Sequence, residues 1–187
     1  MRQAVRDNEG PLAENFELEE VEALAAAAIG EPGRRQFFLL ARGSAQNLVL
    51  ACEKFHIQGL VARARELLEN QELGSLHASA LRPTKNPEVG EPRWQIGELG
   101  LGYHESRRRF VIVAREAQEA PAEEAQGPAT AELAVARIWV TPEQVRDFTE
   151  QADAVLSGGR PTCQYCGLPI DPGGHPCPAS NGSRPIF

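Results

Sequence analysis

Three of the four cysteines in this chain lie close together near the end of the sequence, and they constrain its folding more than any other feature. Cys163, Cys166, His175 and Cys177 follow the pattern C-x2-C-x8-H-x-C. Thiolate and imidazole groups are ligands that zinc prefers, and three cysteines with one histidine form a common structural zinc set. The spacing therefore predicts a zinc-ribbon-like tail, residues 160–187, in which these four residues hold a structural Zn2+ ion.

Other roles of these cysteines fit the sequence less well. Disulfides are rare in a reducing cytoplasm, and a redox C-x-x-C motif normally begins a helix, whose dipole lowers the thiol pKa. The residues after Cys166 are Gly-Leu-Pro-Ile-Asp-Pro, which do not favour a helix. Four protein ligands close a tetrahedral site, so the expected zinc is structural. If His175 were not a ligand, an open site with bound water would support catalysis, with Asp171 as the nearest base.

The rest of the chain shows patterns of strands and two helices. Residues 36–41 and 47–52 are apolar runs across a short turn, which predicts a hairpin. Residues 57–68 carry apolar side chains at helical spacing. Residues 94–103 alternate between polar and apolar, but the phase slips at Gly97-Glu98, which predicts a β-bulge.

The second half completes the predicted architecture. Residues 110–114 and 133–140 read as strands, and Thr141, Pro142 and Gln144 begin a helix with a capping box. Residues 18–29 fit either a helix, because of their alanines, or a strand, because a turn and a strand follow them. We expect an α+β fold, a mainly antiparallel sheet with two helices packed on one face.

Charge and composition divide the chain into regions. Residues 1–15 are polar and predict a flexible arm, and residues 116–132 contain five glutamates without lysine or arginine, which predicts a flexible acidic loop. The net charge of −7 therefore comes mostly from one loop, and the expected α+β domain, residues 16–159, is close to neutral. Nucleic-acid binding, to which Arg107-Arg108-Arg109 could contribute, is possible but not favoured, because a broad basic field is missing.

The same composition bears on location. The longest apolar run is shorter than a membrane helix requires, and the first residues lack the apolar segment of a secretory signal. We therefore expect a cytoplasmic protein that does not enter a membrane. The fourth cysteine, Cys52, ends an apolar strand and is expected to be a buried core thiol.

Several longer motifs carry a family resemblance. The tail reads C-x-x-C-G-x-P-x-D-P-x-G-H-x-C-P over residues 163–178, residues 30–39 read G-x-P-G-x-R-x-F-F-L, and Trp94 precedes G-E-L-G-L-G-Y at 97–103. Over nearly the whole chain these segments resemble an uncharacterised bacterial family, the domain-of-unknown-function family 3090. The resemblance implies a strand at residues 24–29. It implies no activity, because the family has no assigned biochemistry. In some genomes its members are encoded beside a phosphoglycerate-mutase-like phosphatase and a lipid-kinase-like protein, which hints at a shared pathway.

These features predict a zinc-binding protein that acts as a binding or adaptor module for protein partners. Whether it is an enzyme stays undecided, and no catalytic residue is predicted. One alternative is an enzyme of phosphate-ester metabolism that uses a groove between sheet and tail. A pocket in which Glu98, His104 or Arg35 converge would favour it. Another alternative is a nucleic-acid-associated zinc-ribbon factor.

Overall fold

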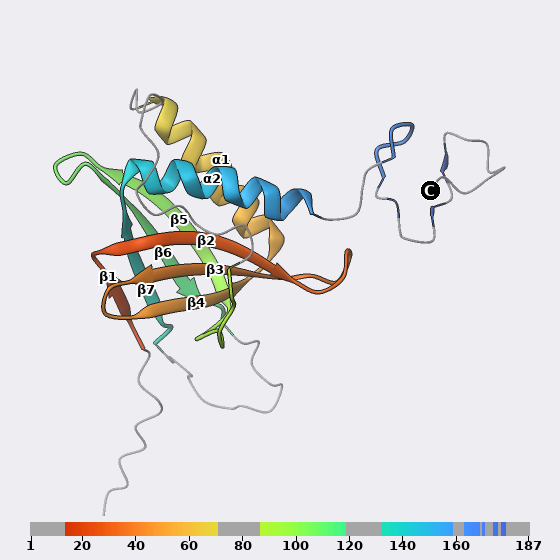
Figure 1. The fold of residues 1–187 in the computed structure, drawn as a ribbon. Helices are drawn as coiled ribbons and strands as arrows, with labels where there is room; N and C mark the ends of the chain where they lie inside the picture. Colours follow the sequence, from red (N-terminus) through yellow and green to blue (C-terminus); the bar gives the residue numbers. More distant parts are fainter. Residues whose placement is uncertain are drawn as a thin grey trace, which may run out of the picture.

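The computed structural model describes residues 14–70, 87–118, 132–158, 163–168, 170, 174–175 and 177–178. Its elements follow one another in the order shown in Figure 1. They are β1 (Phe16–Leu18), β2 (Val21–Ile29), β3 (Gln36–Gly43), β4 (Asn47–Cys52), α1 (Lys54–Asn70), β5 (Ile96–His104), β6 (Arg109–Glu116), β7 (Val135–Val140) and α2 (Pro142–Ser157).

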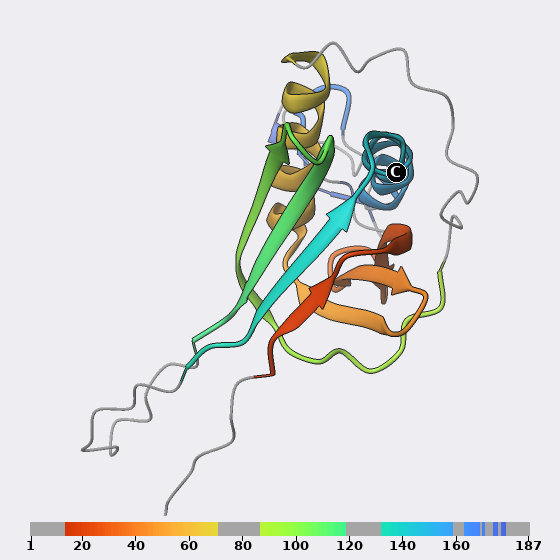
Figure 2. The same cartoon turned by 90° about the vertical axis from the view of Figure 1, so that its left-hand side faces the viewer.

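A four-stranded sheet contains the strands of the second half. Its order is β1-β7-β6-β5, and Figure 2 shows these strands side by side. The β5–β6 and β6–β7 pairs are antiparallel, whereas β1 pairs parallel with β7, with Phe16 opposite Ala136. The β5–β6 register shifts between Ile96 and Glu98, so the bulge predicted at Gly97-Glu98 is present.

A three-stranded antiparallel sheet in the order β2-β3-β4 contains the predicted hairpin. The segment that the sequence left open between helix and strand is β2, as the family resemblance implied. Its alanines favour a helix as an isolated segment, but pairing with β3 along its length overrides this weak propensity. Leu24 and Ala26 are buried in the core from this strand.

Helices α1 and α2 pack against each other (Figure 1). Helix α1 buries Ile57, Leu60 and Val61 among other apolar residues, as its 3.6-residue spacing predicts. Helix α2 begins at the predicted capping box: the Thr141 side chain accepts a hydrogen bond from the Gln144 N–H, and the Gln144 side chain accepts one from the Thr141 N–H. None of the helices in the described part of the chain is long and apolar enough to cross a membrane.

The predicted α+β class is confirmed, with one refinement. The strands form two sheets rather than one, because β2 turns away from β1 after two residues and pairs with β3 instead of extending the first sheet. Main-chain hydrogen bonds from Ala51 N–H to Trp94 O and from Arg93 N–H to Val49 O then connect β4 to the segment that leads into β5. The core lies between the two sheets and the helices.

The predicted division of the chain stays largely a prediction. Residues 1–13 of the expected arm and residues 119–131 of the expected acidic loop lie outside the described residues. At their borders, the Asn15 side chain accepts a hydrogen bond from Val135 N–H, and the Glu116 side chain accepts one from Ala134 N–H. These contacts attach the ends of both segments to the four-stranded sheet.

Candidate metal centre

The first half of the candidate metal centre is a tight turn built on the two cysteines of the C-x-x-C pair. Gly167 N–H donates to Cys163 O at 2.8 Å, and Cys163 N–H donates to Leu168 O at 2.8 Å. Gly167 has a φ of 71°, a conformation that glycine adopts without strain. The turn therefore explains why a glycine directly follows Cys166, and it directs both thiols to the same side.

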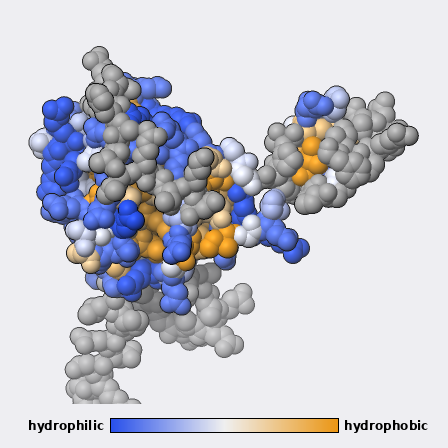
Figure 3. Space-filling model, viewed as in Figure 1, coloured by the Kyte–Doolittle hydropathy of each residue, from blue (hydrophilic) through white to orange (hydrophobic). Residues whose placement is uncertain are grey.

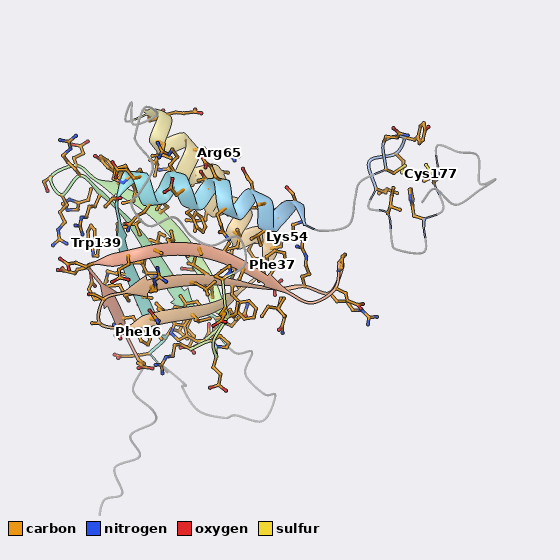
Figure 4. The ribbon with its side chains drawn as sticks, in the orientation of Figure 1. Phe16, Phe37, Lys54, Arg65, Trp139 and Cys177 are labelled. Carbon is orange, nitrogen blue, oxygen red and sulfur yellow. The ribbon has the colours of Figure 1, made fainter. Side chains whose placement is uncertain are left out.

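The second half of the centre comes from His175 and Cys177. Gly174 precedes them with a φ of 88°, so a second glycine allows the chain to return toward the turn. Cys163, Cys177 and His175 are buried, and Cys166 is partly exposed. Figure 4 shows sulfur-bearing side chains gathered around Cys177. Three of the four predicted ligands are thus removed from solvent.

The four predicted ligand atoms converge on one point. The three sulfur atoms and one imidazole nitrogen all lie within 4.8 Å of one another. The Sγ atoms of Cys163 and Cys177 are 3.7 Å apart, and the Cys166 Sγ lies 3.2 Å from the His175 Nε2. Ligands 2.3 Å from a tetrahedral ion would place two sulfurs about 3.8 Å apart. The arrangement therefore fits a single tetrahedral metal ion.

The sulfur separation also excludes a disulfide between the buried pair. A disulfide requires about 2.05 Å between sulfurs, far less than the 3.7 Å between Cys163 and Cys177. The four residues can instead act together as ligands, because each directs one donor atom to the common centre. A site closed by four protein donors stabilises the chain around it and leaves no ligand position for a reacting water.

The electrostatics of the thiols suit metal binding. Burial disfavours the thiolate of Cys163, but hydrogen bonds from the backbone of Tyr165 and Cys166 outweigh burial and hold its pKa below the usual range. The Leu168 N–H lowers the pKa of Cys166, but burial and the neighbouring thiols of Cys177 and Cys163 raise it overall. The pKa values of the two thiols in the C-x-x-C pair are therefore shifted in opposite directions.

The orientation of His175 identifies its donor atom. Its Nε2 faces the thiol of Cys166, while its Nδ1 is buried and has no hydrogen-bond partner among the described residues. Nε2 is thus the ring nitrogen of His175 that faces the thiol of Cys166.

The fourth cysteine lies away from the metal centre, as expected. Cys52 is buried at the end of β4, and burial together with the negative charge of Glu53 raises its pKa to about 12. At pH 8 its thiolate fraction is about one part in ten thousand, against roughly a quarter for an unfolded thiol of pKa 8.5. Cys52 is a core thiol with little nucleophilic character.

This burial predicts selective alkylation. At pH 8, well below the raised pKa, iodoacetamide should label Cys52 roughly a thousand times more slowly in the native protein than in denaturant, because the native thiol stays protonated. Peptide mass spectrometry after timed labelling measures the two rates. Comparable rates in the two states would contradict the assignment of Cys52 as a core thiol.

The residues considered for an enzymatic groove do not converge. Glu98 forms an ion pair with Arg115 at 3.9 Å, and the His104 ring lies edge-on to Trp139, both on the outer face of the four-stranded sheet. The Arg35 guanidinium instead donates to the carbonyl oxygens of Val155 at 2.9 Å and of Leu156 at 3.4 Å. Arg35 therefore stabilises the end of α2. It does not form a shared site with Glu98 and His104.

Arg35 also lines a cavity of about 400 Å3 between the ends of β2 and α2 and residues 87–89. Aliphatic side chains such as Ile29, Val89 and Val155 form much of its wall. Figure 3 shows hydrophobic residues gathered over β2, β3 and β4 on this side of the molecule. Among the described residues that line the cavity, none carries a nucleophile, a carboxylate or an imidazole.

The arginine run at the β5–β6 turn is held in place by contacts within the protein. The Arg107 guanidinium stacks over the Trp139 ring, 4.4 Å from its centre, and lies 3.5 Å from the Glu19 carboxylate. Arg109 donates to the Glu19 carbonyl oxygen at 2.7 Å. Arg107 and Arg109 thus contribute to the fold, and Glu19 partly neutralises the charge of Arg107.

Comparison with known proteins identifies the family. Neither the curated proteins nor the solved structures give a match to the chain. The model of one family matches residues 16–177, from the first strand of the fold to the last cysteine of the metal centre. The chain therefore belongs to the family described as "Protein of unknown function (DUF3090)".

Proposed function

We propose that this protein is a binding or adaptor module whose C-terminal segment is folded by a structural zinc ion. The observation that carries the proposal is the closed set of four donors at Cys163, Cys166, His175 and Cys177. Three thiols with one imidazole favour Zn2+ over the hard cations, which prefer oxygen ligands. When bound, zinc would crosslink the two halves of the C-terminal segment through these four side chains and so stabilise its fold.

The turn that holds the first two ligands also presents apolar side chains to solvent. Tyr165, between the two cysteines, is 63% exposed, and Leu168, just after them, is 49% exposed. Large exposed apolar side chains on a fixed turn are suited to contact with a partner, because little conformational entropy is lost on binding. We define Tyr165 and Leu168 as the display pair, and we assign them to contact with a protein partner.

Metal coordination distinguishes this proposal from the enzymatic alternative. X-ray absorption of the purified, zinc-loaded protein should show three sulfur ligands and one nitrogen ligand. Four protein ligands would fill the tetrahedral coordination of zinc, which is typical of a structural site. An oxygen ligand in place of the histidine nitrogen would indicate a bound water and would favour a catalytic site.

The double variant Tyr165→Ala/Leu168→Ala tests the display pair. It should retain about one zinc per chain, because neither side chain belongs to the donor set, but it should lose at least tenfold in affinity for a partner captured by the wild-type protein. Isothermal titration with that partner measures the loss.

The variant Phe55→Ala is the matched control. Phe55 is equally large and is 62% exposed, but it lies on α1. Its removal should leave the affinity unchanged. Equal affinities of the double variant and the wild type would contradict the adaptor role of the tail.

A further inference from the structure

The edge strands of the two sheets differ in how far other parts of the chain cover them. The free edge of β2 is covered by α2: the Gln151 side chain donates to Ala26 O at 2.8 Å and accepts from Ala26 N–H at 2.9 Å. Gln144 donates to Val21 O further along the same strand. One glutamine amide thus replaces the hydrogen bonds of a neighbouring strand, and this edge is closed to other chains.

Two other edges are also protected. The β4 edge pairs with the segment leading into β5, through hydrogen bonds from Ala51 N–H to Trp94 O at 3.0 Å and from Arg93 N–H to Val49 O at 2.8 Å. The outer strand β1 has three residues, too few to guide the pairing of another chain. The chain therefore covers or shortens three of its four sheet edges.

Strand β5 is the exception. It is nine residues long, contains neither lysine nor proline, and is the last strand of its sheet (Figure 2). Among the described residues, helix α1 packs beside β5, and His56 Nε2 lies 3.3 Å from Gly97 O, but no main-chain hydrogen bond to β5 is made outside its pairing with β6. A long edge of this kind is a template for strand pairing, which most proteins avoid.

The apolar side chains of β5 indicate a missing neighbour. Leu99, Leu101 and Tyr103 point to the core side of the sheet and pack against the core, but each stays partly exposed. Ile112, on the next strand and opposite Leu101, is fully buried. The apolar side chains of β5 therefore have room to bury more surface against a strand added at this edge.

We propose that β5 pairs antiparallel with β5 of a second copy of this chain, about a two-fold axis at Leu101. Strand pairing about such an axis is self-complementary, as a symmetric dimer requires. The two four-stranded sheets then form one continuous sheet across the dimer.

The sequence of β5 fits this register. With the axis at Leu101, Leu99 of each copy faces Tyr103 of the other, and Leu101 faces itself, so every half-buried apolar side chain gains an apolar partner. On the outer face, Glu98 faces His104, so no like charges are opposed. An axis at Gly102 would instead set Leu99 against Glu105. Because the interface is small, we expect a dissociation constant on the order of 10 µM.

Two glycines of β5 can be substituted to disrupt the proposed dimer without disturbing the fold of the monomer. Gly100 and Gly102 face each other across the proposed axis, and neither has a positive φ. A Cβ atom added at either position would meet no atom closer than 4.0 Å and 3.8 Å, respectively. The double variant Gly100→Lys/Gly102→Lys should therefore fold normally, while its lysines oppose one another in the dimer.

Sedimentation equilibrium between about 1 and 200 µM tests the proposal. The wild-type protein should pass from monomer to dimer over this range, and the double lysine variant should stay monomeric with an unchanged unfolding temperature. The variant Val111→Lys/Val113→Lys is the matched control, because it adds the same charges to the same face of the inner strand β6, and it should still dimerise. A wild-type protein that is monomeric throughout, or a double lysine variant that dimerises, overturns the proposal.

Crosslinking tests the register separately. Only an axis at Leu101 places residue 101 opposite itself, at the distance that a disulfide bridges. Under mild oxidation, the variant Leu101→Cys should yield a covalent dimer on a non-reducing gel. The variant Leu99→Cys should not, because its two copies would lie about 13 Å apart along the strands. Crosslinking of both variants to the same extent would overturn the register.

Discussion

Replacement of Cys177 by serine is expected to reduce bound zinc from about one ion per chain to nearly none. Cys177 is 1% exposed, and its sulfur lies 3.7 Å from that of Cys163, so its loss opens the donor set and removes a buried ligand. Structural zinc contributes about 10 kcal/mol or more to the folding of small metal-held segments, so the tail should unfold with it. Inductively coupled plasma mass spectrometry measures the zinc, and limited proteolysis measures the unfolding of the tail.

The chain offers a matched control for this substitution. Cys52 is also buried, at 5% exposure, but it lies on β4 outside the donor set. The variant Cys52→Ala should keep its zinc and the protease resistance of its tail. Stoichiometric zinc in the Cys177→Ser protein, with a resistant tail, would show that the metal centre is wrongly assigned.

Replacement of Gln151 by methionine is expected to lower the free energy of unfolding by about 2 to 4 kcal/mol. The side chains are similar in volume, but methionine cannot exchange hydrogen bonds with Ala26 N–H and Ala26 O. Each buried polar group left without a partner costs about 1 to 3 kcal/mol. Urea denaturation followed by circular dichroism measures the change.

The neighbouring Glu150 provides the comparison for this effect. Glu150 is exposed on α2, one residue before Gln151, so Glu150→Met changes the helix surface but keeps the amide that bonds to β2. Its effect should stay within about 0.5 kcal/mol of the wild type. Equal stabilities of the two methionine variants would mean that the glutamine amide does not support the β2 edge.

Local signals made much of the fold predictable. The capping box of Thr141 and Gln144, the apolar face of α1 and the bulge at Gly97-Glu98 each depend on residues a few positions apart, and all three are present. The clustering of Cys163, Cys166, His175 and Cys177 was also predictable, because cysteine and histidine side chains have few other uses at that spacing. Short-range chemistry was sufficient in these cases.

Long-range pairing was not predictable from the same signals. The parallel β1–β7 contact involves three residues at Phe16–Leu18, too few for a periodic pattern. Gln151 is buried on α2 beside Phe148 and Ala152, and no pattern in the sequence predicts what its amide contacts. Its partner, Ala26, carries no side-chain signal, since the bonds use the main chain. The division into two sheets follows from such contacts.

The parallel pairing of β1 with β7 has a consequence for the order of events during synthesis. The hairpin of β3 and β4 and the helix that follows it can form as soon as they leave the ribosome, since their contacts are local. Phe16–Leu18, although made early, must wait for Val135–Val140 before they have a neighbour. Then α2 emerges and brings Gln151 to Ala26. We therefore expect the nascent chain to stay open at its first strand until nearly the whole fold has been translated.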